Sequence, residues 1–239
     1  MSTSDLGGSQ SLVRGFCLIQ EALQPISKVI YYPCCGVDRT PSIAWPDSQV
    51  IYADREQHCI DQLRQNESLT HCVDVELFDP GPIDILIMLN PTIDPDRPCD
   101  NVKPGGLVIC NNYHLTATRV RSIPRFELIG LAYELSGGMI FDLNQPELHF
   151  YEVETEEELL RVSPNFHAYV TRIVEAKTGT RVNLIPAYRE VARQAEREAW
   201  TPTGFYIGAT VKVGDQLLPI TPLPCKKGTA DSLVVFRRS

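Results

Sequence analysis

The 239-residue sequence has no apolar stretch that approaches the roughly 20 residues required to span a lipid bilayer. Its longest apolar candidates, such as residues 83–89, have the length of β-strands. The first residues also lack a basic region followed by an apolar run and a small-residue cleavage site, which together mark a secretory signal. We therefore expect no membrane partner and a cytoplasmic location.

Basic side chains are in the minority, because 22 lysines and arginines face 30 aspartates and glutamates, and the formal net charge is −8. An acidic chain repels the phosphates of nucleic acids. The composition therefore disfavours nucleic acid as a partner and favours a small molecule or a protein. It does not specify the oligomeric state.

No Cys-x-x-Cys pair occurs among the eight cysteines, so the sequence offers no zinc ribbon. Two His-Cys dipeptides, at residues 58–59 and 71–72, do not form a recognised zinc spacing either. We therefore predict no metal site. Cys34, Cys72 and Cys110 lie in or beside apolar strand-like runs, where a free cysteine packs as a small hydrophobe. This placement favours the reduced thiols of a cytoplasmic protein.

Two common enzyme motifs are also missing. The chain has neither the Gly-x-Ser-x-Gly elbow of α/β-hydrolases nor the Gly-x-x-x-x-Gly-Lys-Ser/Thr loop of P-loop NTPases. The length allows one domain with an elaboration.

Short runs of β-branched, aromatic and aliphatic residues recur along the chain. They lie at residues 28–33, 49–54, 71–74, 83–89, 106–110, 126–133 and 232–237. Strands that are apolar nearly throughout are typical of a parallel sheet covered by helices on both faces. Helical spacing predicts helices at 12–23, 55–66 and 116–124. The prolines between residues 91 and 104 predict a loop with a short helical turn.

The chain from residue 136 onwards has a different character. One or two strands are expected within 140–153, helices at 154–161, 166–177 and 186–199, and a strand at 205–213 followed by a Gly-Asp hairpin signal. Thr155 and Glu158 have the spacing of a capping box at the first of these helices.

Residues 102–109, Val-Lys-Pro-Gly-Gly-Leu-Val-Ile, form the most specific motif. Its two glycines are expected to supply the positive φ needed to enter a buried strand. Together with a strand that ends in an acid and another that ends in Asn-Pro, this motif resembles class I S-adenosylmethionine (SAM)-dependent methyltransferases. The resemblance implies an α/β fold, with a Rossmann-like, mostly parallel sheet flanked by helices, an antiparallel last strand, and an α+β insertion between strands six and seven.

The resemblance also implies that the chain is divided into four parts. These parts are an N-terminal helix at residues 1–27, a SAM-binding core at 28–135, an insertion or lid at 136–220, and a final strand at 221–239 that returns to the core sheet.

In these methyltransferases an acid and three glycines surround the cofactor loop after the first strand, and the glycines let the backbone approach the cofactor. Here residues 32–38 read Tyr-Pro-Cys-Cys-Gly-Val-Asp, so one glycine remains and Tyr32 stands at the position of the acid. Asp38 is the candidate replacement. By resemblance, Asp54 is placed to accept hydrogen bonds from ribose hydroxyls and Asp74 to contact the adenine. The implied cofactor-binding residues are Cys34, Cys35, Gly36, Asp38, Asp54, Arg55, Asp74, Val75 and Asn90.

The sequence leaves a structural alternative open for each part of this site. Residues 32–38 also fit a tight turn without a ligand, Asp54 fits a helix cap, and Asp74 fits a plain turn. Of the two adjacent cysteines, we expect Cys34 to be buried and Cys35 to be the more open thiol.

Polar residues follow the fourth and fifth strands. In some methyltransferases an amide or acid before proline faces the methyl donor, as Asn90 would here, although Asn-Pro is also a common turn. Polar side chains at the carboxyl ends of parallel strands point into the ligand crevice. We name Asn90 and His114 as candidate catalytic residues, with His114 as a general base or, alternatively, a hydrogen-bonded loop histidine. The candidate substrate-binding residues are Asn111, Asn112 and Tyr113.

Two functions are therefore in competition. The first is a divergent SAM-dependent methyltransferase that acts on a small-molecule or protein acceptor. The second is a non-catalytic Rossmann-like domain that binds another ligand or a protein and has lost SAM chemistry, because fold does not dictate function.

Overall fold

The structure is a computed structural model, and most of the chain is described. The described residues are 9–112, 116–135, 138–144, 146, 154–162, 167–168, 170–189, 209–213, 216–220 and 232–239.

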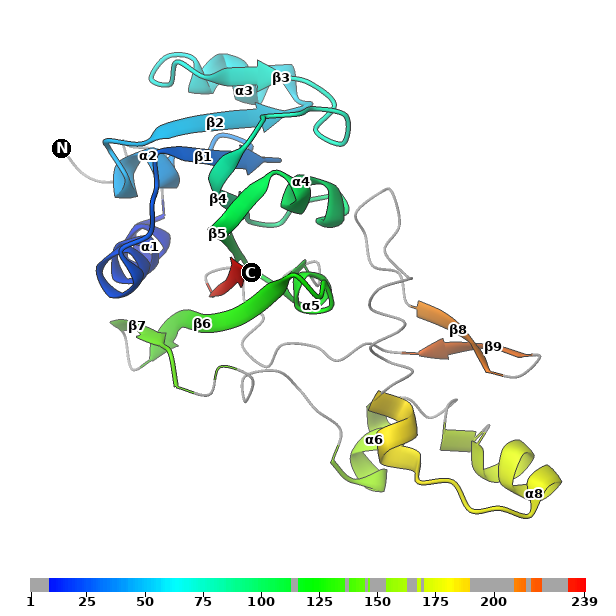
Figure 1. Cartoon of the computed structure of the whole chain (residues 1–239). Coiled ribbons are helices and arrows are strands. Elements are labelled where there is room, and N and C mark those ends of the chain that lie inside the picture. Colours follow the sequence, from blue (N-terminus) through cyan, green and yellow to red (C-terminus); the bar gives the residue numbers. More distant parts are fainter. Residues whose placement is uncertain are drawn as a thin grey trace.

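An eight-stranded sheet with the order β3-β2-β1-β4-β5-β10-β6-β7 forms the centre of the fold (Figure 1). Its strands are β1 (Val29–Pro33), β2 (Gln49–Asp54), β3 (Thr70–Cys72), β4 (Ile83–Met88), β5 (Val102–Cys110), β6 (Phe126–Leu135), β7 (Gly138–Asp142) and β10 (Leu233–Arg238). The first five strands are parallel, and β10 inserts antiparallel between β5 and β6. The prediction of a mostly parallel Rossmann-like sheet with an antiparallel last strand is confirmed.

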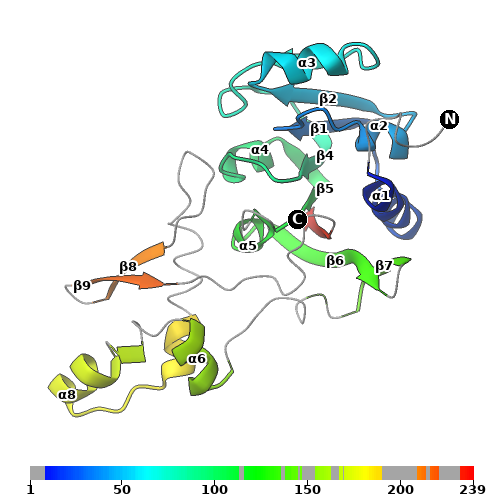
Figure 2. The same cartoon turned by 180° about the vertical axis from the view of Figure 1, so that it is seen from behind.

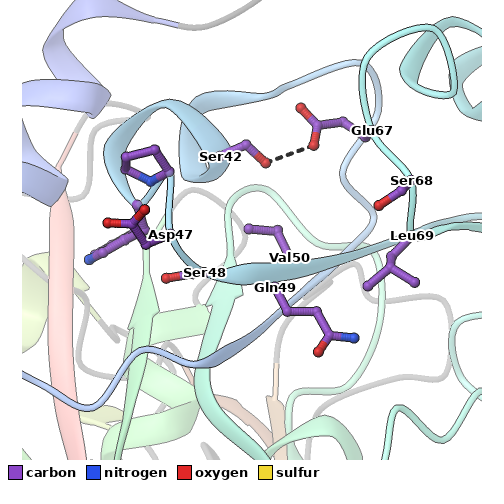
Figure 3. A pocket seen from close by; sticks show the side chains of 10 residues that line it. Ser42, Asp47, Ser48, Gln49, Val50, Glu67, Ser68 and Leu69 are labelled. Carbon is purple, nitrogen blue, oxygen red and sulfur yellow. Dashed lines mark hydrogen bonds between the residues drawn. The ribbon is translucent and has the colours of Figure 1, made fainter.

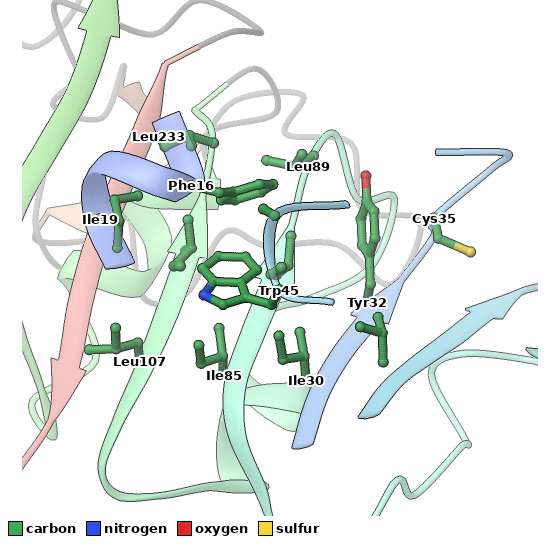
Figure 4. Close-up of a cluster of buried hydrophobic side chains, with 14 of the residues drawn as sticks. Phe16, Ile19, Ile30, Tyr32, Cys35, Trp45, Ile85, Leu89, Leu107 and Leu233 are labelled. Atoms are coloured by element: carbon green, nitrogen blue, oxygen red, sulfur yellow. The ribbon is translucent and has the colours of Figure 1, made fainter. Parts of the chain in front are cut away.

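Helices cover both faces of this sheet (Figures 1 and 2). They are α1 (Gln10–Leu23), α2 (Thr40–Ala44) and α3 (Gln57–Leu63) on one face, and α4 (Asp96–Asp100) and α5 (Thr116–Arg121) on the other. On the first face the rings of Phe16 and Trp45 lie 4.9 Å apart within an apolar cluster (Figure 4). On the second face Cys99 and Val120 are fully buried. The nearly continuous apolar strands of the sequence therefore reflect two separate cores.

The helices near the N-terminus show what periodicity can and cannot predict. Phe16 and Ile19 share the buried face of α1, as their spacing predicts. No helix is predicted from the sequence between the first two strands, yet α2 is present there with Pro41 in its first turn. A helix of five residues is too short to show an amphipathic period, so it escaped detection.

The Lys-Pro-Gly-Gly motif lies inside β5 and coincides with a shift of the β4–β5 register between Ile83 and Ile85. Of its two glycines, only Gly105 has a positive φ, at 77°. Gly106 is required for another reason, because a Cβ atom there would lie 2.7 Å from the carbonyl oxygen of Asp84 and 2.8 Å from that of Lys103. The expectation that both glycines serve a positive φ was therefore wrong for Gly106.

Asp84 is a buried carboxylate near the start of β4. One of its oxygens accepts a hydrogen bond from the Lys103 ammonium at 2.7 Å, and the other accepts the Val29 backbone N–H at 2.9 Å. Burial by itself raises the pKa of Asp84, but the hydrogen bonds from Lys103 and from the backbone outweigh it and hold the pKa below its usual range. This carboxylate thereby joins the starts of β1, β4 and β5.

The remaining elements form no part of the large sheet. They are α6 (Glu156–Val162), a π-helical turn η3 (Val170–Val174), α8 (Glu175–Thr178), a helical turn at 184–189, and the antiparallel pair β8 (Ala209–Val213) and β9 (Gln216–Ile220). The predicted capping box is present, since Glu158 N–H donates to the Thr155 hydroxyl and Thr155 N–H donates to the Glu158 carboxylate. The expected helix at 186–199 is described only as far as residue 189.

The segment expected as an insertion, residues 136–220, begins within the large sheet. Its first described residues form β7, which pairs with β6 from Leu131 to Leu135 and lies at the sheet edge. Among the described residues, no helix is long and apolar enough to cross a membrane.

Replacement of Gly106 tests the close packing at the start of β5. Gly106→Ala is expected to lower the free energy of unfolding by about 1–3 kcal/mol, because the new methyl group clashes with rigid backbone. Gly138→Ala is the matched control, since the nearest atom to a Cβ there is 4.0 Å away. Urea denaturation measures both changes, and equal losses would contradict a specific steric role for Gly106.

Replacement of Asp84 tests the ion pair between its buried carboxylate and the partly exposed Lys103 ammonium. Asp84→Asn is expected to lower the free energy of unfolding by about 1–3 kcal/mol at neutral pH. Because the pKa of Asp84 is lower in the folded state, its ionised form stabilises the fold above about pH 4, and this contribution is lost as the pH falls through the folded pKa. Urea denaturation between pH 7 and pH 3 should therefore show a shrinking difference from the wild type.

Asp61→Asn is the control for this comparison, because Asp61 is exposed and its carboxylate contacts the exposed side chains of Gln57 and Arg64. A difference between Asp84→Asn and the wild type that stays constant down to pH 3 would contradict the proposed ion pair.

Candidate functional site

The strand order reverses direction between β1 and β4, so the carboxyl ends of both strands border the same crevice. Cys34 follows β1, Asp54 ends β2, Asn90 follows β4 and Asn111 follows β5. The fold therefore brings to one edge the residues that the sequence analysis selected from four separate strands.

The turn after β1 has an irregular backbone. Cys34 has a φ of 52°, and Gly36 has a φ of 54°. A non-glycine residue in this region is strained by roughly 1–3 kcal/mol, and such strain concentrates at functional sites. A Cβ atom added to Gly36 would meet nothing within 4 Å, so the backbone there faces open space. Gly36 thus allows the positive φ of this turn and leaves open space next to its backbone.

Asp54 connects this turn to the end of β2. The residue is 8% exposed, and its carboxylate accepts the backbone N–H groups of Gly36 and Glu56, each at 2.9 Å. An ionised carboxylate has about four acceptor positions, so two remain after these bonds. Asp54 therefore fixes the loop and still has lone pairs for hydroxyl donors. It is not the cap of α3, whose N-cap residue is Glu56, and its contact with ribose hydroxyls stays a prediction.

Asp38 is held by groups of the protein itself. One carboxylate oxygen accepts the Tyr32 hydroxyl at 3.0 Å, while the other accepts the backbone N–H of Thr40 at 2.9 Å and the Thr40 hydroxyl. Burial, followed by the charge of Asp38, raises the pKa of Tyr32 well above its ordinary value, so the tyrosine stays neutral and donates. The neutral Tyr32 hydroxyl thus lies at the position where the resemblance implies an acid. Asp38, through its bonds to Thr40, fixes the start of α2.

The predicted adenine side of the site is more open. Asp74 is exposed and accepts the Glu76 N–H at 3.1 Å, as a turn aspartate does, while the adjacent Val75 is buried. Arg55 is exposed and lies 3.6 Å from the Glu56 carboxylate. The role of these residues in cofactor binding stays a prediction.

Two asparagines from neighbouring strands contact each other. Asn90 is exposed with a φ of 53°, and its backbone N–H and side-chain oxygen both bond to the fully buried amide of Asn111. Asn112 is also buried, and its oxygen accepts the Thr118 N–H of α5 at 2.8 Å. Asn112 therefore positions a helix. The predictions for Tyr113 and His114 lie outside the described residues.

The expected order of exposure of the two cysteines was wrong. Cys35 is 3% exposed, and its thiol points towards the Ala53 carbonyl at 3.6 Å, whereas Cys34 is only half-buried. Cys35 belongs to the apolar cluster that contains α1, α2 and α3, whereas Cys34 packs from the side against the cluster on the other face of the sheet. Burial raises the pKa of both thiols, so neither is an activated thiolate.

Thr92 is a neighbour of the site that the sequence analysis missed. Its hydroxyl lies 3.9 Å from the Cys34 sulfur. No sequence signal marks it, because the contact joins the loops after β1 and β4 across the crevice.

Two cavities lie elsewhere among the described residues. One, of about 530 Å³, borders the start of β2, where Ser42 donates a hydrogen bond to Glu67 (Figure 3). The other, of about 410 Å³, lies between α4 and α5 beside Arg119 and Arg125. Neither is lined by a predicted site residue, so they do not add to the carboxyl-edge site.

No protein-family model matches the chain, and no curated protein matches it. Solved structures do match. The plantazolicin methyltransferase BpumL in complex with SAH is 13% identical, with a TM-score of 0.36 over 42% of this chain and 46% of that one. The ribosomal protein L11 methylase from Lactobacillus delbrueckii subsp. bulgaricus is 12% identical, with a TM-score of 0.43 over 55% and 77%. An O-methyltransferase from Bacillus cereus in complex with SAH is 11% identical, with a TM-score of 0.41 over 56% and 79%.

Each of these structures is of a methyltransferase, and each likeness has a TM-score below 0.5. The match spans less than half of the length of the plantazolicin methyltransferase. All three likenesses are weak, so the role of this chain has to be argued from its own residues.

Replacement of Asp38 separates a structural role from a purely ligand-binding one. Asp38→Ala is expected to lower the free energy of unfolding by about 1–3 kcal/mol without any ligand, because it leaves the buried Tyr32 hydroxyl and the Thr40 N–H without their acceptor. The exposed Asp47 provides the control variant Asp47→Ala. Thermal and urea denaturation measure both, and an Asp38→Ala protein as stable as the control would contradict the structural role.

Proposed function

We propose that this protein is a SAM-dependent methyltransferase of a divergent type, with SAM bound across the carboxyl ends of β1, β2 and β4. The observation that carries the proposal is the geometry at Asp54 and Gly36. A buried carboxylate with spare lone pairs lies beside a glycine turn whose backbone faces open space. This arrangement suits a ligand that presents vicinal hydroxyls to the acid and needs close approach to the loop.

The residues of the edge fit SAM in part. Asp54 would hold the ribose hydroxyls, Gly36 would border the chain that joins the ribose to the sulfur, and Asp74 and Val75 would border the adenine. The amino group of the methionine part would lie near the Tyr32–Asp38 pair, where the tyrosine oxygen and the carboxylate supply lone pairs. When bound, SAM supplies an electrophilic methyl group.

The work of the protein is then chiefly to position donor and acceptor. Holding the donor and the acceptor in line converts a bimolecular step into an effectively unimolecular one, which lowers the barrier to methyl transfer. Asn90, at the junction of the crevice and the solvent, is the residue we assign to the acceptor side. Residues 136–220 are proposed to supply the lid over that side, and residues 28–135 the cofactor-binding core.

The acceptor is proposed to be a small molecule or a protein, because the net charge of −8 disfavours nucleic acid. We also propose a cytoplasmic location. Cys35, Cys99 and Cys110 are buried as apolar core residues, a use of cysteine that suits a reducing compartment.

A specific observation supports the second function, a ligand-binding or protein-interaction domain without catalysis. Tyr32 occupies the position of the acid, and Asp38 is already bonded to Tyr32 and Thr40. If this pair excludes the methionine part of SAM, the edge would bind a smaller nucleoside or a protein segment instead.

Binding of S-adenosylhomocysteine (SAH), measured by calorimetry, separates the two functions. We expect saturable binding and stabilisation of the fold by about 2.7 kcal/mol at a ligand concentration one hundred times the dissociation constant. Asp54→Ala is expected to weaken binding at least tenfold, because it removes the acceptor of the ribose hydroxyls, whereas the exposed-site variant Asp61→Ala is expected to bind as the wild type does.

Adenosine is the second ligand in this experiment. Binding of adenosine without SAH would favour the non-catalytic function, and no response to either ligand would refute the placement of SAM. Thermal melts of Asp54→Ala without ligand establish that the variant is folded before its binding is compared.

A further inference from the structure

The backbone N–H of Asn90 determines the orientation of the Asn111 side chain. Asn111 lies at the end of β5 and is fully buried. Its Oδ1 accepts the Asn90 backbone N–H at 3.1 Å. Because a backbone N–H can only donate, the Asn111 atom that faces it must be the oxygen and not the nitrogen of the amide. The usual ambiguity of an asparagine flip is thereby removed for Asn111.

The orientation of Asn111 in turn determines that of Asn90. With its oxygen engaged, Asn111 presents Nδ2 to the Asn90 side chain and donates to Asn90 Oδ1 at 2.6 Å. The oxygen of Asn90 therefore faces inward, and its NH₂ group lies on the other side. Within the described part of the chain, no residue accepts a hydrogen bond from this NH₂ group.

Asn90 lies where its outward NH₂ group could donate a hydrogen bond to a ligand. The residue is exposed, lies at the β1–β4 switch point and has a φ of 53° that asparagine tolerates better than most residues. Two hydrogen bonds to a buried partner hold it, so turning its amide would break the bond to Asn111 Nδ2 and leave a buried donor without an acceptor.

We propose that Asn90 is a fixed hydrogen-bond donor that selects an acceptor substrate carrying an uncharged carbonyl oxygen at this point of the crevice. The assignment of that ligand as the methyl acceptor rests on the proposed function, whereas the polarity of Asn90 does not. Asn111 is the positioning residue, because it acts through Asn90.

The charges around the crevice determine which oxygen fits. Asp38, Asp54 and Asp74 place three carboxylates at the same edge, against the exposed arginine Arg55, which lies 3.6 Å from the Glu56 carboxylate. The nearby Arg39 pairs with Glu67 at 2.8 Å. A ligand carboxylate would be repelled by these charges. An ammonium group would be attracted, but it has only donors and offers no lone pair to the Asn90 NH₂ group. A ketone or amide oxygen satisfies both conditions.

Two isosteric variants reverse the polarity of the exposed group by different routes. Asn90→Asp replaces the outward NH₂ with an oxygen and preserves both inward bonds to Asn111. Asn111→Asp replaces the donor that holds the Asn90 oxygen, so Asn90 must flip its amide and present its oxygen outward. Asn111→Asp buries a carboxylate and is the less stable of the two variants. If Asn111→Asp does not fold, Asn90→Asp alone tests the proposal.

Nuclear magnetic resonance of protein labelled with ¹⁵N-asparagine tests the orientation. The two variants identify the side-chain NH₂ signals of Asn90 and Asn111 by their disappearance. We expect the Asn111 signals to exchange slowly with solvent deuterium and those of Asn90 to exchange at least about tenfold faster, since only the former donate a buried hydrogen bond. The reverse order, or equal rates for the two groups, would overturn the proposal.

Three probes that share a phenyl ring test the selection: acetophenone with a carbonyl oxygen, benzoate with a carboxylate, and benzylamine with an ammonium group. Each is titrated by ligand-observed resonance into the full-length protein, with and without SAH. Acetophenone is expected to bind most tightly to the wild type and to lose about tenfold in affinity in Asn90→Asp, where benzylamine becomes the preferred probe. The same probe order in both proteins, or a wild type that prefers benzoate or benzylamine, would overturn the inference.

The arms with and without SAH separate this inference from the proposed function. Acetophenone selectivity in a protein that does not bind SAH would retain the donor at Asn90 and reject the methyltransferase. SAH binding without acetophenone selectivity would retain the methyltransferase and reject the donor.

Discussion

Burial of both faces of the parallel strands is the constraint on which the rest of the structure depends. β1, β4 and β5 are covered on one face by α1, α2 and α3 and on the other by α4 and α5. The side chains of β4 are buried throughout, as are those of the last four residues of β1 and of β5. Strands that are enclosed on both faces cannot carry polar groups along their length without paired partners. Asp84 is the one carboxylate within these three strands, and it is satisfied by Lys103 and by the backbone of Val29. Polar chemistry is therefore confined to the ends of the strands.

At the carboxyl ends, polar groups first satisfy one another. Asp54 bonds to the turn after β1, Asp38 to Tyr32 and Thr40, and Asn111 to Asn90. The bonds of Asp54 and Asn111 join loops from different strands, and those of Asp38 hold the loop after β1 to its own strand and to α2. The edge is therefore held in place even though Cys34 and Asn90 have strained backbones. Rigid placement of a few polar atoms in a crevice is what both binding and catalysis require.

The departure from the usual methyltransferase loop follows from the same bonds. Tyr32 is 3% exposed, and its hydroxyl needs an acceptor because a buried hydroxyl without a partner is costly. Asp38 supplies that acceptor and at the same time fixes the start of α2. The loop has thus exchanged an acid on the strand for a tyrosine–aspartate pair, and the lone pairs of that pair are the feature on which the binding of an amino group would depend.

The sequence by itself determined the strands, since runs such as residues 83–89 are apolar at every position but one, and it determined α1 through the spacing of Phe16 and Ile19. It also determined the capping box of Thr155 and Glu158, because that motif is a local pattern of four residues. It did not determine α2, which is too short to show a period, or the reason for Gly106, which is a contact with the backbone of Asp84, twenty-two residues away.

Only the tertiary structure decided which atoms the site presents. Asp54, Asn90 and Asn111 could be selected from the sequence because parallel strands bring their carboxyl ends to one edge of the sheet. That rule holds whatever the conformations of the individual side chains. Whether Cys34 or Cys35 is buried, and whether Asn90 offers an oxygen or an NH₂ group, depends on hydrogen bonds and packing between loops that are distant in the chain. Local pattern therefore specifies where the polar residues gather, and long-range contacts specify what each of them can bind.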